Sequence, residues 1–351
     1  MRLSLPILKL YKLPILLGIL SAILYYLFAY DLVRTEYLKL INLYTALFIL
    51  FVFFVRNQKE NIKFLTSVSF LFRIILLFSI PNLSQDFYRF IWDGRMILEG
   101  WNPYLATPEF FISKGEFPVL QAQELYNGMG ALNGSHFTNY PPLNQICFVI
   151  AGMFAGKSIL GSVIAMRLLI IAADFGTLHY GKKLLEKLNI PVHYFFWFIL
   201  NPFVIIELTG NLHFEAVMIF FLVWSLYMLY NNKQNLAAIL FACSISIKLI
   251  PLMFLPIFYQ KLGWRKSLRF YVVVGIISFL FFISFYSTEF LNNYSETVGL
   301  WFQKFEFNAS LYYIARELGY LFRGYNEIAI IGKIIPVVVV LFVLIITFYR
   351  K

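Results

Sequence analysis

The sequence of 351 residues is poor in charge: Asp, Glu, Lys and Arg together make up 13% of it, whereas 60% is hydrophobic. Soluble domains carry about 25% charged residues, and a soluble core of this length could not bury so much apolar surface. These values exclude a soluble globular protein. Together with the mean hydropathy of +0.74, they indicate a polytopic membrane protein.

Cysteine is scarce as well, with only Cys147 and Cys243, both inside apolar segments. There is no CxxC pair and no Cys/His cluster, so the sequence supports neither a disulfide framework nor a zinc site. It also lacks a P-loop, a G-x-S-x-G elbow, an H-E-x-x-H motif and a dinucleotide fingerprint. Chemistry on soluble nucleotides would therefore have no phosphate-binding motif. No cofactor is required, and a divalent metal is left open without a ligand set to support it.

Lys and Arg outnumber Asp and Glu by 29 to 18, which gives a net charge of +11. These basic residues lie scattered in short segments between apolar runs, where they set membrane topology and face anionic lipid. The charge therefore predicts membrane lipids, and not nucleic acid, as the partner.

Ten apolar stretches are long enough to cross or nearly cross a bilayer, so the sequence predicts an all-α bundle of about ten transmembrane helices. The first is preceded by a basic segment without a small-residue cleavage site, which favours a retained helix over a cleaved signal. The expected spans are 13–30, 40–55, 64–80, 143–156, 158–178, 192–208, 213–230, 236–258, 270–286 and 327–349.

Loop charge gives the expected orientation. Basic residues at Arg2, in 56–63, in 259–269 and at Arg350 and Lys351 place those segments on the cytoplasmic side. The long segment 81–142 has six acidic residues against three basic ones, and three crossings also place it outside.

One segment conflicts with this count. The stretch 181–189, GKKLLEKLN, has three lysines, yet counting helices places it outside. Either this stretch lies in the outer interface, or one of the spans 143–156 and 236–258 does not fully cross.

The outer segment begins with LSQDFYRFIWDGRMILEGWNPY, which spans 83–104. Residues 86–99 form an apolar stripe at helical spacing, and Asp86 and Asp93 lie at its edge. We expect an amphipathic helix on the outer leaflet, ended by Gly100, with both carboxylates at the lipid–water boundary. A carboxylate there could act as a base, whereas the alternative is a solvated helix face with Asp–Arg pairs.

Polar residues also interrupt two later apolar regions. Glu207, Asn211, His213 and Glu215 lie in the hairpin 201–215, and Lys248 lies inside a predicted span. A lysine within a membrane requires an anionic partner, which could be a lipid phosphate, Glu207 or Glu215. For Arg167 and Asp174, seven residues apart in one span, we favour a structural role between helices.

Five motifs in one order resemble the GT-C superfamily of integral-membrane glycosyltransferases. The similarity is to polyprenol-phosphate-mannose-dependent mannosyltransferases, including a bacterial branch formerly classed as a domain of unknown function and, more distantly, GPI mannosyltransferase I. The motifs are the acidic motif at 84–87, GWNPY at 100–104, YPPL at 140–143, NP at 201–202 and KLIP at 248–251.

This resemblance implies an inverting enzyme that moves a sugar, most often mannose, from a polyprenyl phosphate to a lipid-linked or glycan acceptor outside the membrane. The family often has two acids in the first motif, but here Ser84 occupies one position, so Asp86 is the expected catalytic base and Asp93 a second acid. Candidates for binding the donor phosphate or the substrate are Arg89, Lys248, His213, Glu215, Asn211, Tyr88, Asn102, Tyr140 and Arg316.

The resemblance divides the chain into two additional N-terminal helices (1–60), a GT-C-like core (61–286), and a second outer segment with a last helix (287–351). A lipid or glycan transporter is the alternative from another class, and a non-catalytic scaffold is a third. A transporter predicts inverted repeats, which the sequence does not show.

Overall fold

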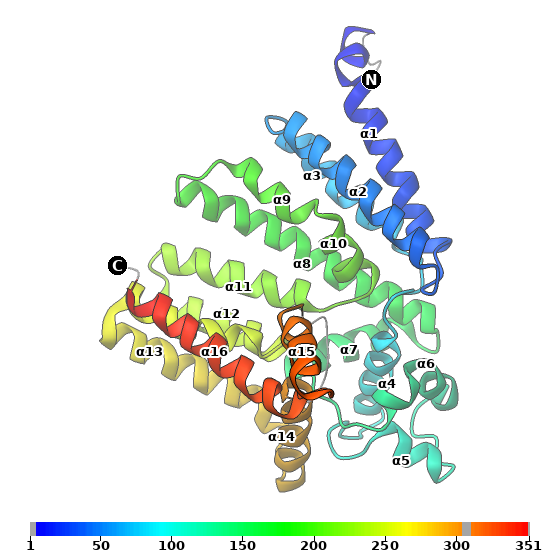
Figure 1. Ribbon diagram of the computed structural model, residues 1–351, viewed down its shortest axis with the longest axis vertical. Coiled ribbons are helices and arrows are strands. Elements are labelled where there is room, and N and C mark those ends of the chain that lie inside the picture. The colour runs from blue at the N-terminus through cyan, green and yellow to red at the C-terminus, as the bar shows by residue number, and fades with distance from the viewer. Residues whose placement is uncertain (1–4, 304–309, 350–351) are drawn as a thin grey trace.

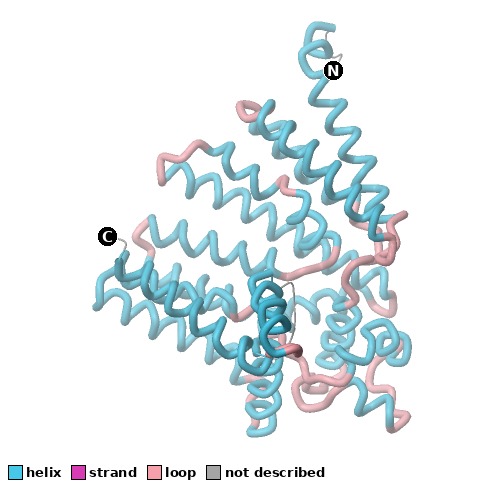
Figure 2. The backbone as a smooth tube through the Cα atoms, in the orientation of Figure 1, coloured by secondary structure: helices cyan, strands magenta, loops and turns pink. Residues whose placement is uncertain are grey.

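The computed structural model describes residues 5–303 and 310–349, and within these ranges every regular element is a helix (Figures 1 and 2). The predicted all-α class is therefore confirmed. The basic residues Arg2, Arg350 and Lys351, which were used to predict orientation, lie outside the described residues.

Five helices in the described ranges are long and apolar enough to cross a membrane. They lie in α1 (Leu5–Tyr30), α2 (Tyr37–Asn57), α8 (Ile159–Lys187), α13 (Leu255–Ile283) with the preceding η3 (Ile250–Phe254), and α16 (Ile328–Tyr349).

A bent pair of short helices can form a sixth span. Its first part is η1 (Val192–Phe195) with α9 (Phe196–Ile199), and its second is α10 (Pro202–Val204) with the π-helical turn η2 (Ile205–Gly210). The two parts meet at 52° at Asn201 and Pro202, where proline ends the first helix and begins the second.

The other apolar helices are shorter: α3 (Ile62–Ile75), α7 (Pro142–Ala155), α11 (Glu215–Tyr230) and α12 (Gln234–Ile247). A helix of 14 residues, such as α7, is about 21 Å long, less than the roughly 30 Å of a bilayer's hydrocarbon core. All ten expected ranges contain helix, and the count of ten complete crossings remains a prediction.

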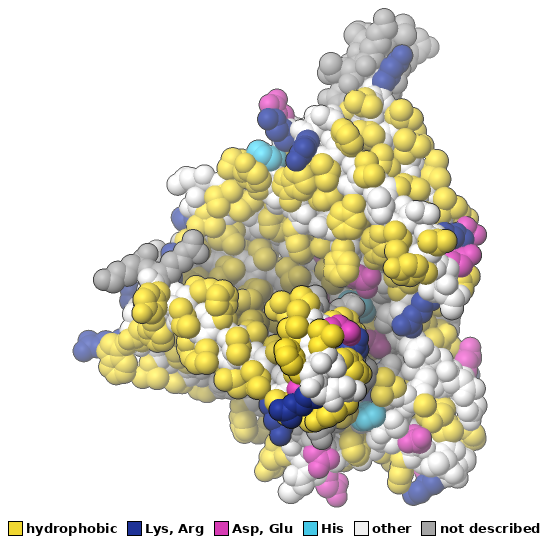
Figure 3. All heavy atoms as spheres, viewed as in Figure 1, with side chains coloured by type: hydrophobic (Ala, Val, Ile, Leu, Met, Phe, Trp, Pro, Cys, Tyr) yellow, Lys and Arg dark blue, Asp and Glu magenta, His cyan; other side chains and the backbone are white. Residues whose placement is uncertain are grey.

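The two predicted outer segments also fold into helices. The first contains α4 (Asp86–Leu98), α5 (Pro108–Ser113) and α6 (Ala122–Gly134), and the second contains α14 (Thr288–Gln303) and α15 (Ser310–Arg323). Figure 1 shows α4, α5 and α6 gathered at one end of the bundle, where α1, α3 and α8 each have one terminus. Hydrophobic side chains cover most of the face in Figure 3, and charged ones lie mainly at its rims.

The lysine-rich end of α8 lies at the opposite end of the bundle from α4 (Figure 1). The connections from α2 to α3 and from α11 to α12 lie at that same end. The segment 181–189 therefore lies at the same end as the basic loop 56–63. The two spans named as alternatives for an incomplete crossing, 143–156 and 236–258, both contain helices of only 14 residues, α7 and α12.

Buried arginines join the helices. Arg73 of α3 pairs with Asp174 of α8, with Nε 2.6 Å from Oδ2, and both side chains are almost fully buried. Arg167 of α8 donates to the carbonyls of Leu77, Ser79, Thr209 and Gly210. Arg167 and Asp174 thus make inter-helix contacts, as the sequence predicted, and they hold the segments that lead into α4 and α11.

The helix α4 forms where it was predicted and ends as predicted, because Gly100 has the positive φ of +83° typical of a helix C-terminus. The alternative of a solvated helix face is wrong, although the Asp–Arg pairing that it included is present between Arg89 and Asp93. Trp92 is 1% exposed and Arg95 is 5% exposed, and Arg95 donates to the Leu120 carbonyl. Residues 108–134 cover the polar side of α4, so both faces of this helix pack against other parts of the protein.

Candidate active site

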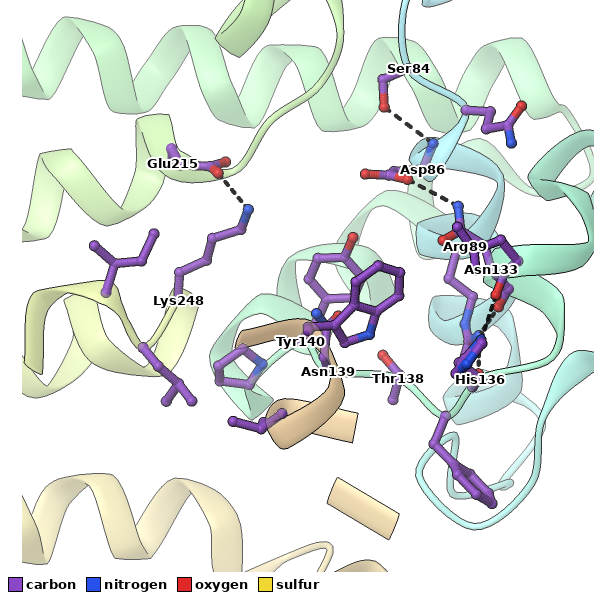
Figure 4. Close-up of a pocket in the computed structure, with 18 of the residues that line it drawn as sticks. Ser84, Asp86, Arg89, Asn133, His136, Thr138, Asn139, Tyr140, Glu215 and Lys248 are labelled. Carbon is purple, nitrogen blue, oxygen red and sulfur yellow. Dashed lines mark hydrogen bonds and ion pairs between the residues drawn. The ribbon is translucent and has the colours of Figure 1, made fainter. Parts of the chain in front are cut away.

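A cavity of about 620 Å³ opens where α4 meets segments from distant parts of the chain (Figure 4). Its wall includes the start of α4, the segment 132–141, the start of α11, residues 248–250 at the start of η3, the loop between α1 and α2, and α14. Of the predicted site residues, five line it: Asp86, Arg89, Tyr140, Glu215 and Lys248.

Asp86 is the first residue of α4 and its carboxylate lines the cavity. Asn133, near the end of α6, donates from Nδ2 to Asp86 Oδ1 at 3.0 Å. The Asp86 backbone N–H donates to Ser84 Oγ at 3.3 Å, so the serine that replaces an acid in the first motif holds the turn before α4. Asp86 is only half-buried, and its second carboxylate oxygen makes no hydrogen bond within the described part of the chain. It is therefore positioned to accept a proton from a molecule in the cavity.

Lys248 and Glu215 form an ion pair on the opposite wall, with Nζ 2.5 Å from Oε1. Lys248 lies just past the C-terminus of α12, in extended backbone, and Glu215 begins α11. About a quarter of each side chain is exposed, so the ammonium reaches the cavity while Glu215 satisfies it. This pairing settles the anionic partner of Lys248 in favour of Glu215 over Glu207.

Arg89 lines the cavity but is held within the protein. Its Nε donates to Asp93 Oδ1 at 2.7 Å, and its Nη1 donates to the carbonyls of Asn133 and His136. Asp93 is fully buried and also accepts from Gln145 Nε2 at 3.1 Å. Asp93 is therefore absent from the cavity wall, and the predicted second acid instead anchors Arg89 and, through it, the segment that follows α6.

Tyr140 lies between the two walls, on the segment that leads into α7 (Figure 4). Burial raises the pKa of its hydroxyl well above the ordinary value, and the carboxylates of Asp86 and Glu215 raise the pKa further. The hydroxyl therefore remains protonated near neutral pH and can donate a hydrogen bond. Its carbonyl accepts from the buried Tyr104 hydroxyl at 2.6 Å, which ties the GWNPY and YPPL motifs together.

The remaining predicted residues do not line the cavity. Asn102 forms a turn, accepting from the Tyr104 N–H at 3.0 Å and donating to the Phe285 carbonyl. Tyr88 packs its ring against Phe87 and lies where a side chain at Gly128 would stand. Both residues thus support the fold.

Asn211 and His213 lie beside Glu207, behind the cavity wall. Asn211 donates to Glu207 and accepts from the Leu83 N–H at 3.2 Å, which fixes the segment before Asp86. His213 Nδ1 lies 3.7 Å from Glu207 Oε2. Arg316 lies on α15 next to Glu317 and also does not line the cavity.

The lining residues that were not expected from the sequence include Arg34, Asn133, His136 and Trp301. The rings of His136 and Trp301 lie 6.0 Å apart, so they bring α14 to the segment that follows α6. These residues come from connections or helix ends with no motif. Only their position in outer segments could have indicated them.

Among the described residues, no group of three or more His, Cys, Asp or Glu side chains could hold a metal ion. What the cavity offers is one oriented carboxylate, a tyrosine hydroxyl and several cationic side chains. This set can take a proton from a hydroxyl and neutralise an anion.

Comparison with known proteins agrees with this chemistry. Residues 21–262 match the family described as Alpha-(1->6)-mannopyranosyltransferase, N-terminal domain. The chain is also 20% identical over 220 residues to Alpha-(1->6)-mannopyranosyltransferase A of Mycobacterium tuberculosis, which covers 60% of this chain and 41% of the relative. The chain thus spans about two fifths of the length of that curated relative. No solved structure matches it significantly.

Proposed function

Because the chain belongs to the Alpha-(1->6)-mannopyranosyltransferase family, we propose that it is an inverting mannosyltransferase that uses a polyprenyl-phosphate-mannose donor and a lipid-linked or glycan acceptor. The observation that carries this proposal is the placement of Asp86 and Lys248 on opposite walls of one cavity. A carboxylate faces an ammonium across a space large enough for a sugar. The family match does not favour the alternative of a lipid or glycan transporter.

In this mechanism Asp86 accepts the proton of the acceptor hydroxyl. The acceptor oxygen forms a bond to the anomeric carbon, and the bond from that carbon to the phosphate oxygen breaks, with inversion. The phosphate leaves with the electron pair, and cationic side chains such as Lys248 stabilise its charge. Asn133 holds Asp86 by one oxygen and leaves the other for the proton.

Topology supports an outward-facing site. The basic segments 56–63 and 181–189 lie at the end of the bundle away from the cavity, which favours that end as cytoplasmic (Figure 1). A cavity at the other end would meet the phosphate of a lipid-linked donor in the outer leaflet. A donor that is already activated requires no nucleotide site, consistent with the absence of phosphate-binding motifs from the sequence.

The test is transfer of radiolabelled mannose from polyprenyl-phosphate-mannose into lipid or glycan by membranes carrying the protein, with GDP-mannose as a second donor. Asp86→Asn should lower the rate about 10²–10⁴-fold, the range for loss of a general base. Glu99→Gln is the matched control, since it removes the same charge from the exposed end of the same helix. Equal rates for Asp86→Asn and wild type would refute the assignment of the base, and transfer from GDP-mannose alone would refute the donor.

A further inference from the structure

Some of the charged side chains that line the cavity form ion pairs within the protein, and others do not. Lys248 is paired with Glu215, and Arg89 with the buried Asp93. Two charged side chains of the wall remain, Asp86 and Arg34. Within the described chain, no ion pair or hydrogen bond of the Arg34 side chain is found, and Asp86 is bonded to Asn133. Once the internal pairs are set aside, the cavity therefore presents one carboxylate and one guanidinium.

Arg34 lies in residues 31–36, the loop between α1 and α2, far in sequence from the rest of the wall. The other charges of this loop satisfy one another. Lys39 Nζ lies 2.9 Å from Asp31 Oδ2 and 3.1 Å from Glu36 Oε2, and Glu36 Oε2 also accepts from the Val33 N–H. Both nearby carboxylates thus pair with Lys39, and within the described chain neither of them forms an ion pair with Arg34.

The same loop is fastened to the segment that carries the candidate base. Asn82 Nδ2 donates to the carbonyls of Phe28 and Leu32, at 2.7 and 3.1 Å, and Leu32 is 5% exposed. Asn82 precedes Asp86 by four residues. The backbone that presents Arg34 and the backbone that presents Asp86 are therefore held at a fixed separation, as a binding site requires.

We infer that Arg34 binds the phosphate of a polyprenyl-linked molecule, which makes the loop between α1 and α2 part of the donor site. This inference rests on the proposed function and adds a phosphate ligand to it. A guanidinium presents a planar fork of donors that matches two phosphate oxygens, and it stays charged at any physiological pH. Bound to Arg34, the phosphate lies in the same cavity as Asp86, which the transfer reaction requires. The role of α1 and α2 is then to complete the substrate site.

The test is binding of farnesyl phosphate, a short prenyl phosphate, to the full-length protein in detergent. Arg34→Gln should raise its Kd about 10–100-fold, the range for loss of charge-assisted hydrogen bonds, and Arg34→Lys should lose less. Arg56→Gln is the matched control: it removes the same charge from the exposed other end of α2. Thermal unfolding without ligand checks that each variant is folded.

Two further probes separate the sources of binding. Farnesol lacks the phosphate, so Arg34→Gln should not change its binding, and inorganic phosphate should bind far more weakly than farnesyl phosphate to the wild type. The inference is overturned by an equal Kd for Arg34→Gln and wild type, by no binding of farnesyl phosphate to the wild type, by an equal loss of farnesol binding, or by inorganic phosphate binding as tightly as farnesyl phosphate.

Asp86→Asn separates this inference from the proposed function. It should abolish transfer and still bind farnesyl phosphate, because it leaves Arg34 in place. A wild type that binds farnesyl phosphate through Arg34 but transfers no mannose would refute the transferase proposal alone. Transfer with unchanged binding in Arg34→Gln would refute the phosphate site alone.

Discussion

Asn133 Nδ2 lies 3.0 Å from Asp86 Oδ1 and joins the end of α6 to the start of α4. The amide fixes one carboxylate oxygen and leaves the other directed to the reaction. Asn133→Ala should lower kcat about 10-fold, typical of losing one hydrogen bond of about 1.5 kcal/mol to a charged group, and leave the Kd of farnesyl phosphate unchanged. Asn127→Ala, on the exposed face of α6, is the control. A changed Kd with normal kcat would contradict this role.

Substitutions of the two members of the Lys248–Glu215 ion pair should lower activity by different amounts. Lys248→Met removes the cation that we propose stabilises the leaving phosphate and should lower kcat about 10²–10³-fold, as for loss of one electrostatic stabiliser. Glu215→Gln keeps that cation and should lower kcat less than about 10-fold. Steady-state transfer rates of both variants check this order. The reverse order would assign Glu215, and not Lys248, to the reaction.

Gly94 allows α4 to approach α7. A Cβ at this position would lie 2.5 Å from the Phe148 carbonyl oxygen, so Gly94→Ala must push the two helices apart. We expect a destabilisation of about 1–3 kcal/mol, the usual range for overpacking, and loss of transfer because α4 carries Asp86. Thermal unfolding in detergent measures the first effect. Gly18→Ala in α1, where nothing lies within 4 Å, should change neither property.

The buried pair of Arg73 and Asp174 should behave as a coupled unit. Asp174→Leu alone leaves a buried guanidinium without its carboxylate and should destabilise by about 3–5 kcal/mol, whereas adding Arg73→Met should recover most of that loss. A double-mutant cycle of unfolding free energies measures the coupling. Glu317→Gln, in the exposed pair with Arg316, should leave the unfolding temperature unchanged. Additive effects of the two buried substitutions would contradict the coupling.

The sequence predicted what depends on local pattern. Hydrophobic periodicity located α4 and its end at Gly100, and the isolation of Lys248 in an apolar run indicated that it needed an acid. Burial of Asp93 could not be predicted, because amphipathicity defines one apolar face of α4 and says nothing about what covers the other. That cover consists of residues 108–134, whose polar sequence gives little sign that they pack on α4.

The cavity residues that the sequence did not predict were missed for one common reason. Arg34, Asn133 and Trp301 come from a loop and from the ends of two helices, and no spacing rule relates them. They meet only because Asn82 and the buried Arg167 fix the connections around α4, and such contacts over long sequence distances leave no local signal. The sequence therefore left open the role of the two N-terminal helices, which lie outside the motif region.

The wall of the cavity draws on residues from Arg34 in the first loop to Trp301 in α14. A protein folds from its N-terminus during synthesis, so this cavity wall is complete only after Trp301 has left the ribosome. If the proposed function holds, a partly made chain has an incomplete cavity and should not act on lipid-linked sugar during its own synthesis. Activity should therefore require the complete cavity. Truncation from either end should abolish activity at a length at which the remaining chain still folds.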